Sequence, residues 1–279
     1  MTTVDEYLYE LLSRKQNNGK YTQNEERAYE KIADYINQWK QTYYNSFYSW
    51  NNVNIEMQKS GSRAKGDAIK GKSDIDIFVS IIDPNNRNTV KEYYEDLYSF
   101  LKEKMPTNSM RKQNVSIGID YAGCSIDVTP GKRINRQIYR NGRYYTDHYI
   151  YSRKTDNNTQ TNIQTHIDLV RNSGLANEMM ILKIWRNCHA LELPSIAIEI
   201  LTEEILRYNK SSSLYVNVKR VFESLRDTIM DRRIIDPSNT TNNIADGIKK
   251  AEKEEIRKKA IQAISYDDGE RVWTSKIVW

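Results

Sequence analysis

The feature that most constrains this chain is a short alternation of acidic and apolar residues at positions 74–79. Asp74 and Asp76 are one residue apart, and the intervening and following positions hold Ile75, Ile77 and Val79. Successive side chains of a β-strand point to opposite faces, so the pattern predicts a strand with one buried apolar face and both carboxylates on the other. Carboxylates this close repel each other unless a cation neutralises them, and oxygen ligands favour Mg²⁺ or Mn²⁺ over zinc. We therefore expect a divalent-metal site, although a lone Asp-x-Asp pair is more often a solvated strand edge.

A turn of small residues precedes the acidic strand. Gly61 and Ser62 open a short predicted helix, and Ser62 stands twelve residues before Asp74. Such a turn offers a hydroxyl and backbone N–H groups to a phosphate. The turn is therefore predicted to bind an anion.

A third carboxylate is expected from a neighbouring strand. Asp127 lies between Ile126 and Val128, which are β-branched and favour a strand. Three acids around two metal ions form a site for in-line phosphoryl transfer, in which a hydroxyl is activated and pyrophosphate leaves. The alternative is that Asp127, close to a Pro-Gly turn, is only a turn residue. Taken together, the acids predict nucleotidyl transfer.

Composition narrows the class of protein. The 279 residues include 42 Lys+Arg and 37 Asp+Glu, a net charge of +5 that is too small for a purely electrostatic nucleic-acid binder. The 20 tyrosines and 5 tryptophans supply apolar bulk, which argues against disorder. The two cysteines, Cys124 and Cys188, have no partners at metal-ligand spacing, so neither a zinc site nor a disulfide scaffold is expected. Acidic residues near the start and the lack of a long apolar run predict a cytoplasmic protein without membrane contact.

The periodicity of apolar residues predicts two lobes. Residues 21–50 have helical spacing and are expected to form one long amphipathic spine helix. Strand-like runs at 74–82 and 115–129 flank a helical stretch at 90–104, which predicts a small α/β unit. The pattern then becomes helical, with helices expected at 166–191, 195–209, 213–232 and 244–265. The polar stretches 155–165 and 236–243 are expected to be loops. We thus predict an α/β catalytic lobe at 1–160, a helical lobe at 161–279, and an active site in the cleft between them.

These motifs resemble a known family. Gly61-Ser62, Asp74-x-Asp76 and Asp127 are similar to the catalytic pattern of the DNA polymerase β nucleotidyltransferase superfamily. Segments 182–185, 193–199 and 236–243 resemble helical-lobe motifs of one branch. That branch holds the oligoadenylate synthases, the cyclic GMP-AMP synthase-like enzymes of bacterial antiphage defence (CD-NTases), and the class I CCA-adding enzymes. The resemblance implies a polymerase β-like mixed sheet followed by a helical lobe.

The resemblance also assigns roles to individual residues. It implies that Asp74, Asp76 and Asp127 bind two Mg²⁺ or Mn²⁺ ions, and that Asp127 lies nearest the acceptor hydroxyl. It implies that Ser62, following Gly61, holds the triphosphate of a donor such as ATP or GTP. The oligomeric state is not indicated.

Two further residues of the helical lobe are implied to contact the donor phosphates, namely Lys183 and Ser195. Lys183 lies in a segment that is apolar nearly all round, so its charge needs a partner; the alternative is that it extends along its methylenes to the surface. Ser195 follows Pro194 at a helix start, where helix capping is an equally good explanation. The chain departs from the family at Asp67, where a Thr or small residue is common. This acid is expected either to oppose the triphosphate or to point outward.

A basic stretch interleaved with tyrosines, residues 132–154, follows the third acid. It has the composition of a surface that guides RNA or a second nucleotide, but a solvated crossover between the lobes is the favoured interpretation. The histidines form no constellation, so no histidine base is expected.

Three functions remain open. The first, favoured by chain length, is a template-independent synthase that joins nucleoside triphosphates into a linear or cyclic oligonucleotide messenger, consistent with antiphage defence. The second is nucleotidyl transfer to a macromolecule, either the tRNA 3′ end or a protein, with RNA or protein as acceptor or activator. The third is an inactive nucleotide-binding module, against which three clustered carboxylates argue. Transfer to a small molecule such as an antibiotic fits the first motif alone, but the helical-lobe resemblance argues against it.

Overall fold

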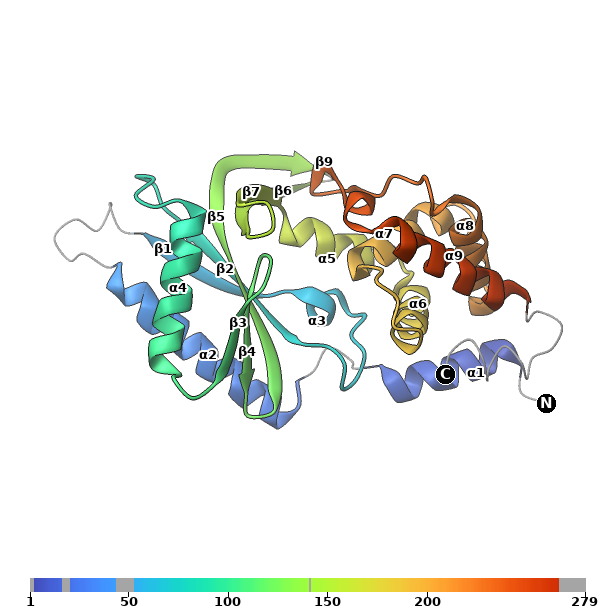
Figure 1. The fold of residues 1–279 in the computed structure, drawn as a ribbon, viewed down its shortest axis with the longest axis horizontal. Coiled ribbons are helices and arrows are strands. Elements are labelled where there is room, and N and C mark those ends of the chain that lie inside the picture. Colours follow the sequence, from blue (N-terminus) through green and yellow to red (C-terminus); the bar gives the residue numbers. More distant parts are fainter. Residues whose placement is uncertain (1–2, 17–20, 44–52, 141, 266–279) are drawn as a thin grey trace. The chain divides into compact units, whose positions relative to one another are not determined.

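A computed structural model describes residues 3–16, 21–43, 53–140 and 142–265 (Figure 1). In chain order, the helices and strands are α1 (Val4–Lys15), α2 (Gln23–Thr42), β1 (Asn54–Lys59), α3 (Gly61–Lys65), β2 (Ile75–Ile82), α4 (Val90–Lys104), β3 (Ser109–Lys112), β4 (Ile117–Tyr121), β5 (Cys124–Arg140), β6 (Arg143–Ser152), β7 (Asn157–Thr161), α5 (Ile163–Arg171), α6 (Ala176–Cys188), α7 (Ser195–Leu206), α8 (Leu214–Thr228), β8 (Ile235–Asp236), β9 (Asn239–Asn243), the 3-10 helix η2 (Ile244–Gly247) and α9 (Lys250–Ser265).

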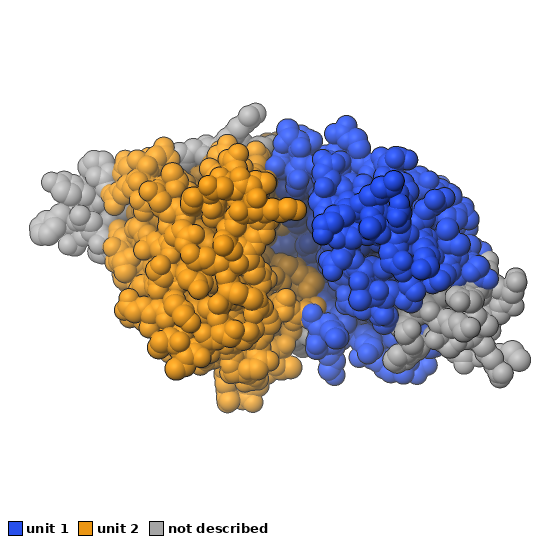
Figure 2. Space-filling view, viewed as in Figure 1, with its two compact units in different colours: residues 1–18, 65–72, 166–279 blue, residues 19–64, 73–165 orange. Residues whose placement is uncertain are grey.

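The chain divides into two compact units, coloured separately in Figure 2. Unit 1 contains residues 1–18, 65–72 and 166–279, and unit 2 contains residues 19–64 and 73–165. The predicted lobes, 1–160 and 161–279, are consecutive segments of sequence. In the structure, by contrast, α1 and the segment 65–72 group with the C-terminal helices.

Unit 2 is built on a mixed sheet in the order β1-β2-β5-β4-β3, with β6 pairing β5 and β7 pairing β6. Strands β2 and β5 are parallel, while β1–β2, β4–β5 and β5–β6 are antiparallel. The apolar residues of β2 pack with those of α2 and α4 in one core, in which Trp39 meets Tyr93 edge to face. The predicted α/β unit with a mixed sheet is therefore confirmed.

The predicted spine helix is present, and it begins at Gln23 rather than at residue 21. Helix α2 starts after Thr22, whose side chain caps it together with Glu25, and its buried face includes Ile32, Ile36 and Trp39. The end of the prediction, at residues 44–50, lies outside the described residues.

The predicted β-rich run at 115–129 is confirmed and contains two strands, because the chain reverses at Ala122 and Gly123, which both have positive φ. Two other predictions for unit 2 were wrong. The basic, tyrosine-rich stretch is not a crossover between lobes, since β5 and β6 form an antiparallel hairpin there. Most of the segment expected as a loop at 155–165 is strand β7 and the start of α5.

Unit 1 is helical, as expected, and its core is formed by α1, α6, α7, α8 and α9. The single helix predicted over 166–191 is interrupted between α5 and α6, where Gly174 adopts φ +65°. The stretch expected as a loop at 236–243 forms the small hairpin β8–β9.

The segment 65–72 is an integral part of unit 1. Ile69 belongs to the helical core and forms an isolated bridge with Gln16, and the Lys70 N–H donates to the Lys15 carbonyl at 2.7 Å. None of the described helices is long and apolar enough to cross a membrane.

Candidate active site

The acidic strand has the predicted pattern. In β2, Ile75, Ile77 and Val79 are fully buried, whereas Asp76 lies on the opposite, partly accessible face. Asp74 immediately precedes the strand and is exposed. The alternation of the sequence therefore separates a core face from an acidic face.

The third predicted acid lies beside the second. Strand β5 pairs with β2 in parallel, and the register places Asp127 directly opposite Asp76. Neighbouring residues of paired strands have side chains on the same face of the sheet. The acids at 76 and 127, which are 51 positions apart in sequence, therefore share one face.

Burial and a nearby like charge perturb Asp127. Burial, together with the negative charge of Asp74, raises the pKa of the Asp127 carboxyl to about 6, although Arg111 and a hydrogen bond from Gln113 oppose the rise. Gln113 Nε2 donates to Asp127 Oδ1 at 3.0 Å. A bound cation would relieve the remaining electrostatic cost.

The predicted phosphate turn lies against the same acids. Gly61 begins α3 with φ +63°, and a Cβ atom there would lie 1.8 Å from Asp76 Oδ2. The Ser60 N–H donates to the Asp76 carbonyl at 3.0 Å. Glycine is therefore required at position 61 both by backbone conformation and by the approach of the Asp76 carboxylate.

Arg63 anchors the turn, and sequence reasoning missed it. Its guanidinium is buried, forms an ion pair with Glu25 of α2, and lies 4.7 Å from the ring centre of Tyr21. These contacts fix α3, and with it Ser62, against the start of the spine helix. No sequence signal identifies this pair, because the two charges are 38 positions apart.

The acidic face has the chemistry of a site for a hard divalent cation. Its donors are carboxylate oxygens, which suit Mg²⁺ or Mn²⁺, and the raised pKa of Asp127 reflects its burial and the nearby negative charge of Asp74. Within the described ranges, no three acidic, histidine or cysteine side chains already converge on one point. Binding an ion would therefore require the carboxylates of Asp74 and Asp76 to turn toward that of Asp127, which Gln113 already holds.

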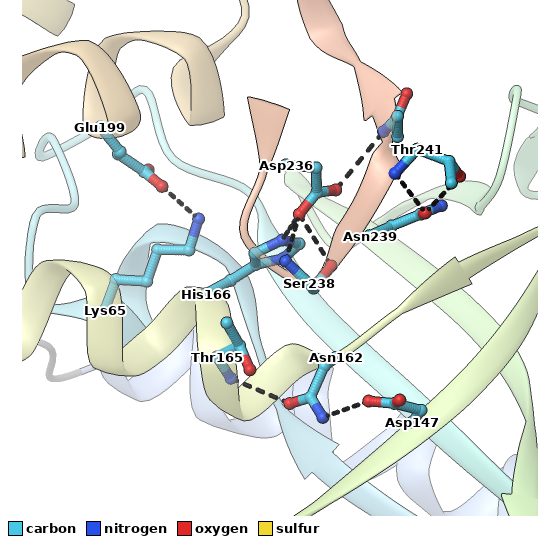
Figure 3. Close-up of polar contacts among 11 residues, drawn as sticks. Lys65, Asp147, Asn162, Thr165, His166, Glu199, Asp236, Ser238, Asn239 and Thr241 are labelled. Carbon is cyan, nitrogen blue, oxygen red and sulfur yellow. Dashed lines mark hydrogen bonds and ion pairs between the residues drawn. The ribbon is translucent and has the colours of Figure 1, made fainter. Parts of the chain in front are cut away.

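Lys183 lies in a buried charge cluster of unit 1. Its ammonium group contacts the Asp67 carboxylate and Glu199 Oε1, the latter at 2.7 Å. Lys65 contacts the other oxygen, Glu199 Oε2, at 2.7 Å (Figure 3). The side chains of Lys183, Asp67 and Glu199 are at most 3% exposed. Lys183 therefore has the partner that its apolar surroundings require, and the alternative that it reaches the surface is wrong.

The buried cluster also settles the orientation of Asp67. The expectation that this acid points outward was wrong, because its side chain is fully buried against Lys183. That it opposes the triphosphate stays a prediction. Burial raises the pKa of Asp67, with Lys183 opposing the rise. Burial alone would raise the pKa of Glu199 too, but Lys65 and Lys183 hold it below its ordinary value. That Lys183 contacts donor phosphates stays a prediction.

Ser195 is the first residue of α7 and does not cap it. Pro194 occupies the N-cap position, without a side-chain cap hydrogen bond, and Ser195 Oγ accepts from Arg186 at 3.1 Å. The helix-capping alternative is therefore wrong, and phosphate contact by Ser195 stays a prediction.

Two histidines have polar partners that the sequence did not reveal. His166 Nε2 lies 2.8 Å from Asp236 Oδ1, which also accepts from the Ser238 N–H and hydroxyl (Figure 3). His148 Nε2 lies 2.8 Å from Ser80 Oγ, and burial lowers the pKa of His148 to about 4. Ser80 lies on the same face of β2 as Asp76, so this pair belongs to the acidic face of the sheet, where the neutral imidazole is buried.

Comparison with known proteins agrees with this geometry. A family model for the nucleotidyltransferase domain matches residues 44–117, a range that holds Gly61, Ser62, Asp74 and Asp76. The class of enzyme predicted from the sequence, a nucleotidyltransferase, is confirmed.

More particular relatives are CD-NTases. The chain is 25% identical over 224 residues to the cyclic AMP-AMP-AMP synthase of Escherichia coli (strain MS 115-1), covering 68% of each protein. It is similar in structure to CdnC of E. coli MS115-1 solved with ATP (TM-score 0.71, 18% identity, 98% of this chain and 96% of that one). It is also similar to the CD-NTase CdnG of Bradyrhizobium diazoefficiens in complex with GTP (TM-score 0.71, 13% identity, 99% and 95%). The fold is therefore that of the CD-NTases, and the resemblance read from the sequence is confirmed.

Proposed function

We propose that this protein is a template-independent nucleotidyltransferase that joins nucleoside triphosphates into a short oligonucleotide messenger and releases pyrophosphate. The observation that carries the proposal is the pairing of Asp76 with Asp127 on adjacent parallel strands, beside a turn that only glycine can form at position 61. A cyclic product and a role in antiphage defence are proposed from the relative that is named as a cyclic AMP-AMP-AMP synthase.

In the proposed reaction, Ser62 and its turn hold the triphosphate of the donor, such as ATP or GTP. Asp74, Asp76 and Asp127 would hold two divalent cations, which supply Lewis-acid stabilisation of the developing charge when bound. The acceptor hydroxyl oxygen forms a bond to the α-phosphorus, and the bond from that phosphorus to the pyrophosphate oxygen breaks.

Asp127 is suited to accept the proton of the attacking hydroxyl. Its carboxylate shares one face of the sheet with Asp76, so a hydroxyl that approaches the metal-binding acids comes within its reach. The Gln113 hydrogen bond engages Oδ1 and so limits rotation of the carboxylate. We infer that Asp127 is the residue nearest the acceptor.

A macromolecule as acceptor or activator is the second candidate. Tyr139 and Tyr144 lie on the basic β5–β6 hairpin with ring centres 4.9 Å apart, and both are more than half exposed. Exposed aromatic rings stack on bases of single-stranded RNA. A protein activator is proposed because CdnC of E. coli MS115-1 has been solved in complex with a HORMA protein.

The testing experiment supplies purified protein with all four labelled nucleoside triphosphates and Mg²⁺ or Mn²⁺, with and without tRNA. Small products that resist phosphatase and form without RNA support the messenger synthase, and mass spectrometry identifies their bases. Label found only on tRNA supports the second candidate.

Two variants accompany the assay. Asp74→Ala/Asp76→Ala is expected to make no product. Asp34→Asn, which removes an exposed carboxylate of α2, is expected to match the wild-type protein. Product formation by the double variant at the wild-type rate would refute the assignment of the acids.

A further inference from the structure

Gln113 reaches from a turn into the acidic site. It lies between β3 and β4, in the turn that joins these antiparallel strands. Its backbone N–H donates to the Ser116 carbonyl at 2.9 Å, and its side-chain Oε1 accepts from Ser116 Oγ at 2.5 Å. Its Nε2 donates to Asp127 Oδ1 at 3.0 Å. The side chain therefore bridges the turn and the third acid.

The orientation of this amide follows from its partners. If the amide were flipped, its oxygen would face the Asp127 carboxylate, and two acceptors would lie in contact without a proton between them. The Ser116 hydroxyl instead supplies the proton that Oε1 needs, which leaves Nε2 directed at Asp127. The hydroxyl and the carboxylate together define one orientation.

Space for the bridge comes from Gly118. This residue of β4 lies opposite Asp127 in the β4–β5 register. A Cβ atom at Gly118 would lie 2.7 Å from Gln113 Nε2 and 3.0 Å from Arg111 Cγ. Its backbone does not have positive φ, so conformational freedom does not explain the glycine. The missing side chain instead provides the path by which Gln113 crosses β4 to reach β5.

The turn that carries Gln113 is held firmly. The Tyr94 hydroxyl lies 2.9 Å from the Ser116 carbonyl and 3.3 Å from the Gln113 carbonyl, and Tyr94 is fully buried. The Arg153 N–H donates to the Asn114 carbonyl at 2.8 Å. A donor fixed at both backbone and side chain loses little conformational entropy when it binds a carboxylate.

We propose that Gln113 is a positioning residue, which holds one oxygen of Asp127 through a path left open by Gly118 and thereby presents the carboxylate to the divalent cation. The inference rests on the proposed function of Asp127 as a metal ligand. Partners that orient a metal-binding carboxylate typically change metal affinity about 10–100-fold when they are removed. Gln113 belongs to this class, although it need not touch the nucleotide.

The first test measures binding of Mn²⁺ to the protein without nucleotide, from the loss of the free-ion signal in electron paramagnetic resonance. Gln113→Leu, which keeps the side-chain bulk and removes both polar atoms, is expected to weaken Mn²⁺ binding about 10-fold. Gln38→Leu, which alters an exposed glutamine of α2, is the matched control and is expected to bind Mn²⁺ as the wild-type protein does. Thermal unfolding in EDTA verifies that each variant is folded.

A second substitution, at Gly118 of β4, perturbs the same hydrogen bond between Gln113 and Asp127. Gly118→Ala places a methyl group in the path of the Gln113 amide and is expected to weaken Mn²⁺ binding as well. Because both changes break one contact, Gln113→Leu/Gly118→Ala is expected to bind no more weakly than the weaker single variant. If Gln113→Leu fails to fold, Gln113→Met, which keeps an unbranched side chain and removes both polar atoms, takes its place.

Wild-type Mn²⁺ affinity in a folded Gln113→Leu protein would overturn the inference, as would fully additive losses in the double variant. Turnover measured on the same proteins separates this inference from the proposed function. If Gln113→Leu and Asp127→Asn both lose Mn²⁺ affinity while the wild-type protein makes no product, the positioning inference stands and the function fails. If Asp127→Asn is inactive while Gln113→Leu binds Mn²⁺ normally, the function stands and the inference fails.

Discussion

Asp127→Asn is expected to stabilise the metal-free protein while abolishing nucleotidyl transfer. Burial and the charge of Asp74 raise the pKa of the Asp127 carboxyl from 3.8 to about 6 in the folded protein. The folded state therefore binds the proton more tightly than the unfolded state, and ionisation of this group costs folding free energy. Asparagine has nearly the same shape, can accept the Gln113 hydrogen bond through its oxygen, and does not ionise.

The size of the effect follows from the pKa difference. A shift of about 2 units corresponds to roughly 3 kcal/mol at 1.36 kcal/mol per unit. Asp127 is only partly buried, so solvent screening reduces the expected gain to about 1–2 kcal/mol, or an increase of about 2–6 °C in unfolding temperature.

The pH dependence identifies the cause. The folding free energy lost by ionising Asp127 is absent below pH 4, grows as the pH rises from 4 to 6, and is fully present at pH 8. The stability gained by Asp127→Asn should therefore appear at pH 8 and vanish at pH 4.

The assay is thermal unfolding in EDTA at both pH values. Asp120→Asn, which removes a half-exposed carboxylate of β4 paired with Arg111, is the control and should bring no gain at pH 8. Adding Mn²⁺ should stabilise the wild-type protein more than Asp127→Asn. A variant that is less stable than wild type at pH 8, or equally stabilised at both pH values, would refute the reasoning.

Three more predictions follow from single contacts. Gly61→Ala places a Cβ atom 1.8 Å from Asp76 Oδ2, so it should lower the free energy of unfolding in urea by about 1–3 kcal/mol and lower turnover about 100-fold. Gly123→Ala, also at positive φ but with open space around it, is the control and should preserve turnover. Lys183→Met leaves two buried carboxylates without their shared ammonium group and should lower the free energy of unfolding in urea by about 3–5 kcal/mol. A decrease below about 1 kcal/mol would contradict the buried cluster. Burial lowers the pKa of His148 to about 4 in the folded protein, so the unfolded state takes up the proton first as the pH falls. The stability that neutral His148 contributes is therefore complete above pH 6.5 and is lost as the pH falls toward 4. Over that range the urea midpoint of His148→Gln should fall less than that of the wild-type protein, and an equal fall would argue against a buried neutral imidazole.

The acidic strand was predictable because its signal is local. The period-two alternation at Asp74 to Val79 fixes both the buried face and the acidic face within six positions. The position of Asp127 depends on strand pairing across a distant part of the chain, but its β-branched neighbours and the chemical need for a third acid indicated it.

The other contacts could not be predicted because they join distant residues without any periodic signal. Lys183 was expected to need a partner, but nothing in the sequence identified Asp67, which is 116 positions away. The β5–β6 hairpin escaped prediction because its tyrosines and basic residues lack the apolar alternation of a half-buried strand. Gln113 escaped because a single polar residue in a turn carries no pattern, and its role depends on the missing side chain at Gly118.

We propose that the acidic face of β2 and β5 is a metal-dependent nucleotidyl-transfer centre. Anomalous diffraction from crystals soaked with Mn²⁺ and a non-hydrolysable ATP analogue tests this proposal most directly. We expect Mn²⁺ peaks about 2.0–2.6 Å from carboxylate oxygens of Asp74, Asp76 and Asp127, with the triphosphate against the turn at Ser62. An ordered triphosphate bound elsewhere, with no Mn²⁺ at these three acids, would contradict it.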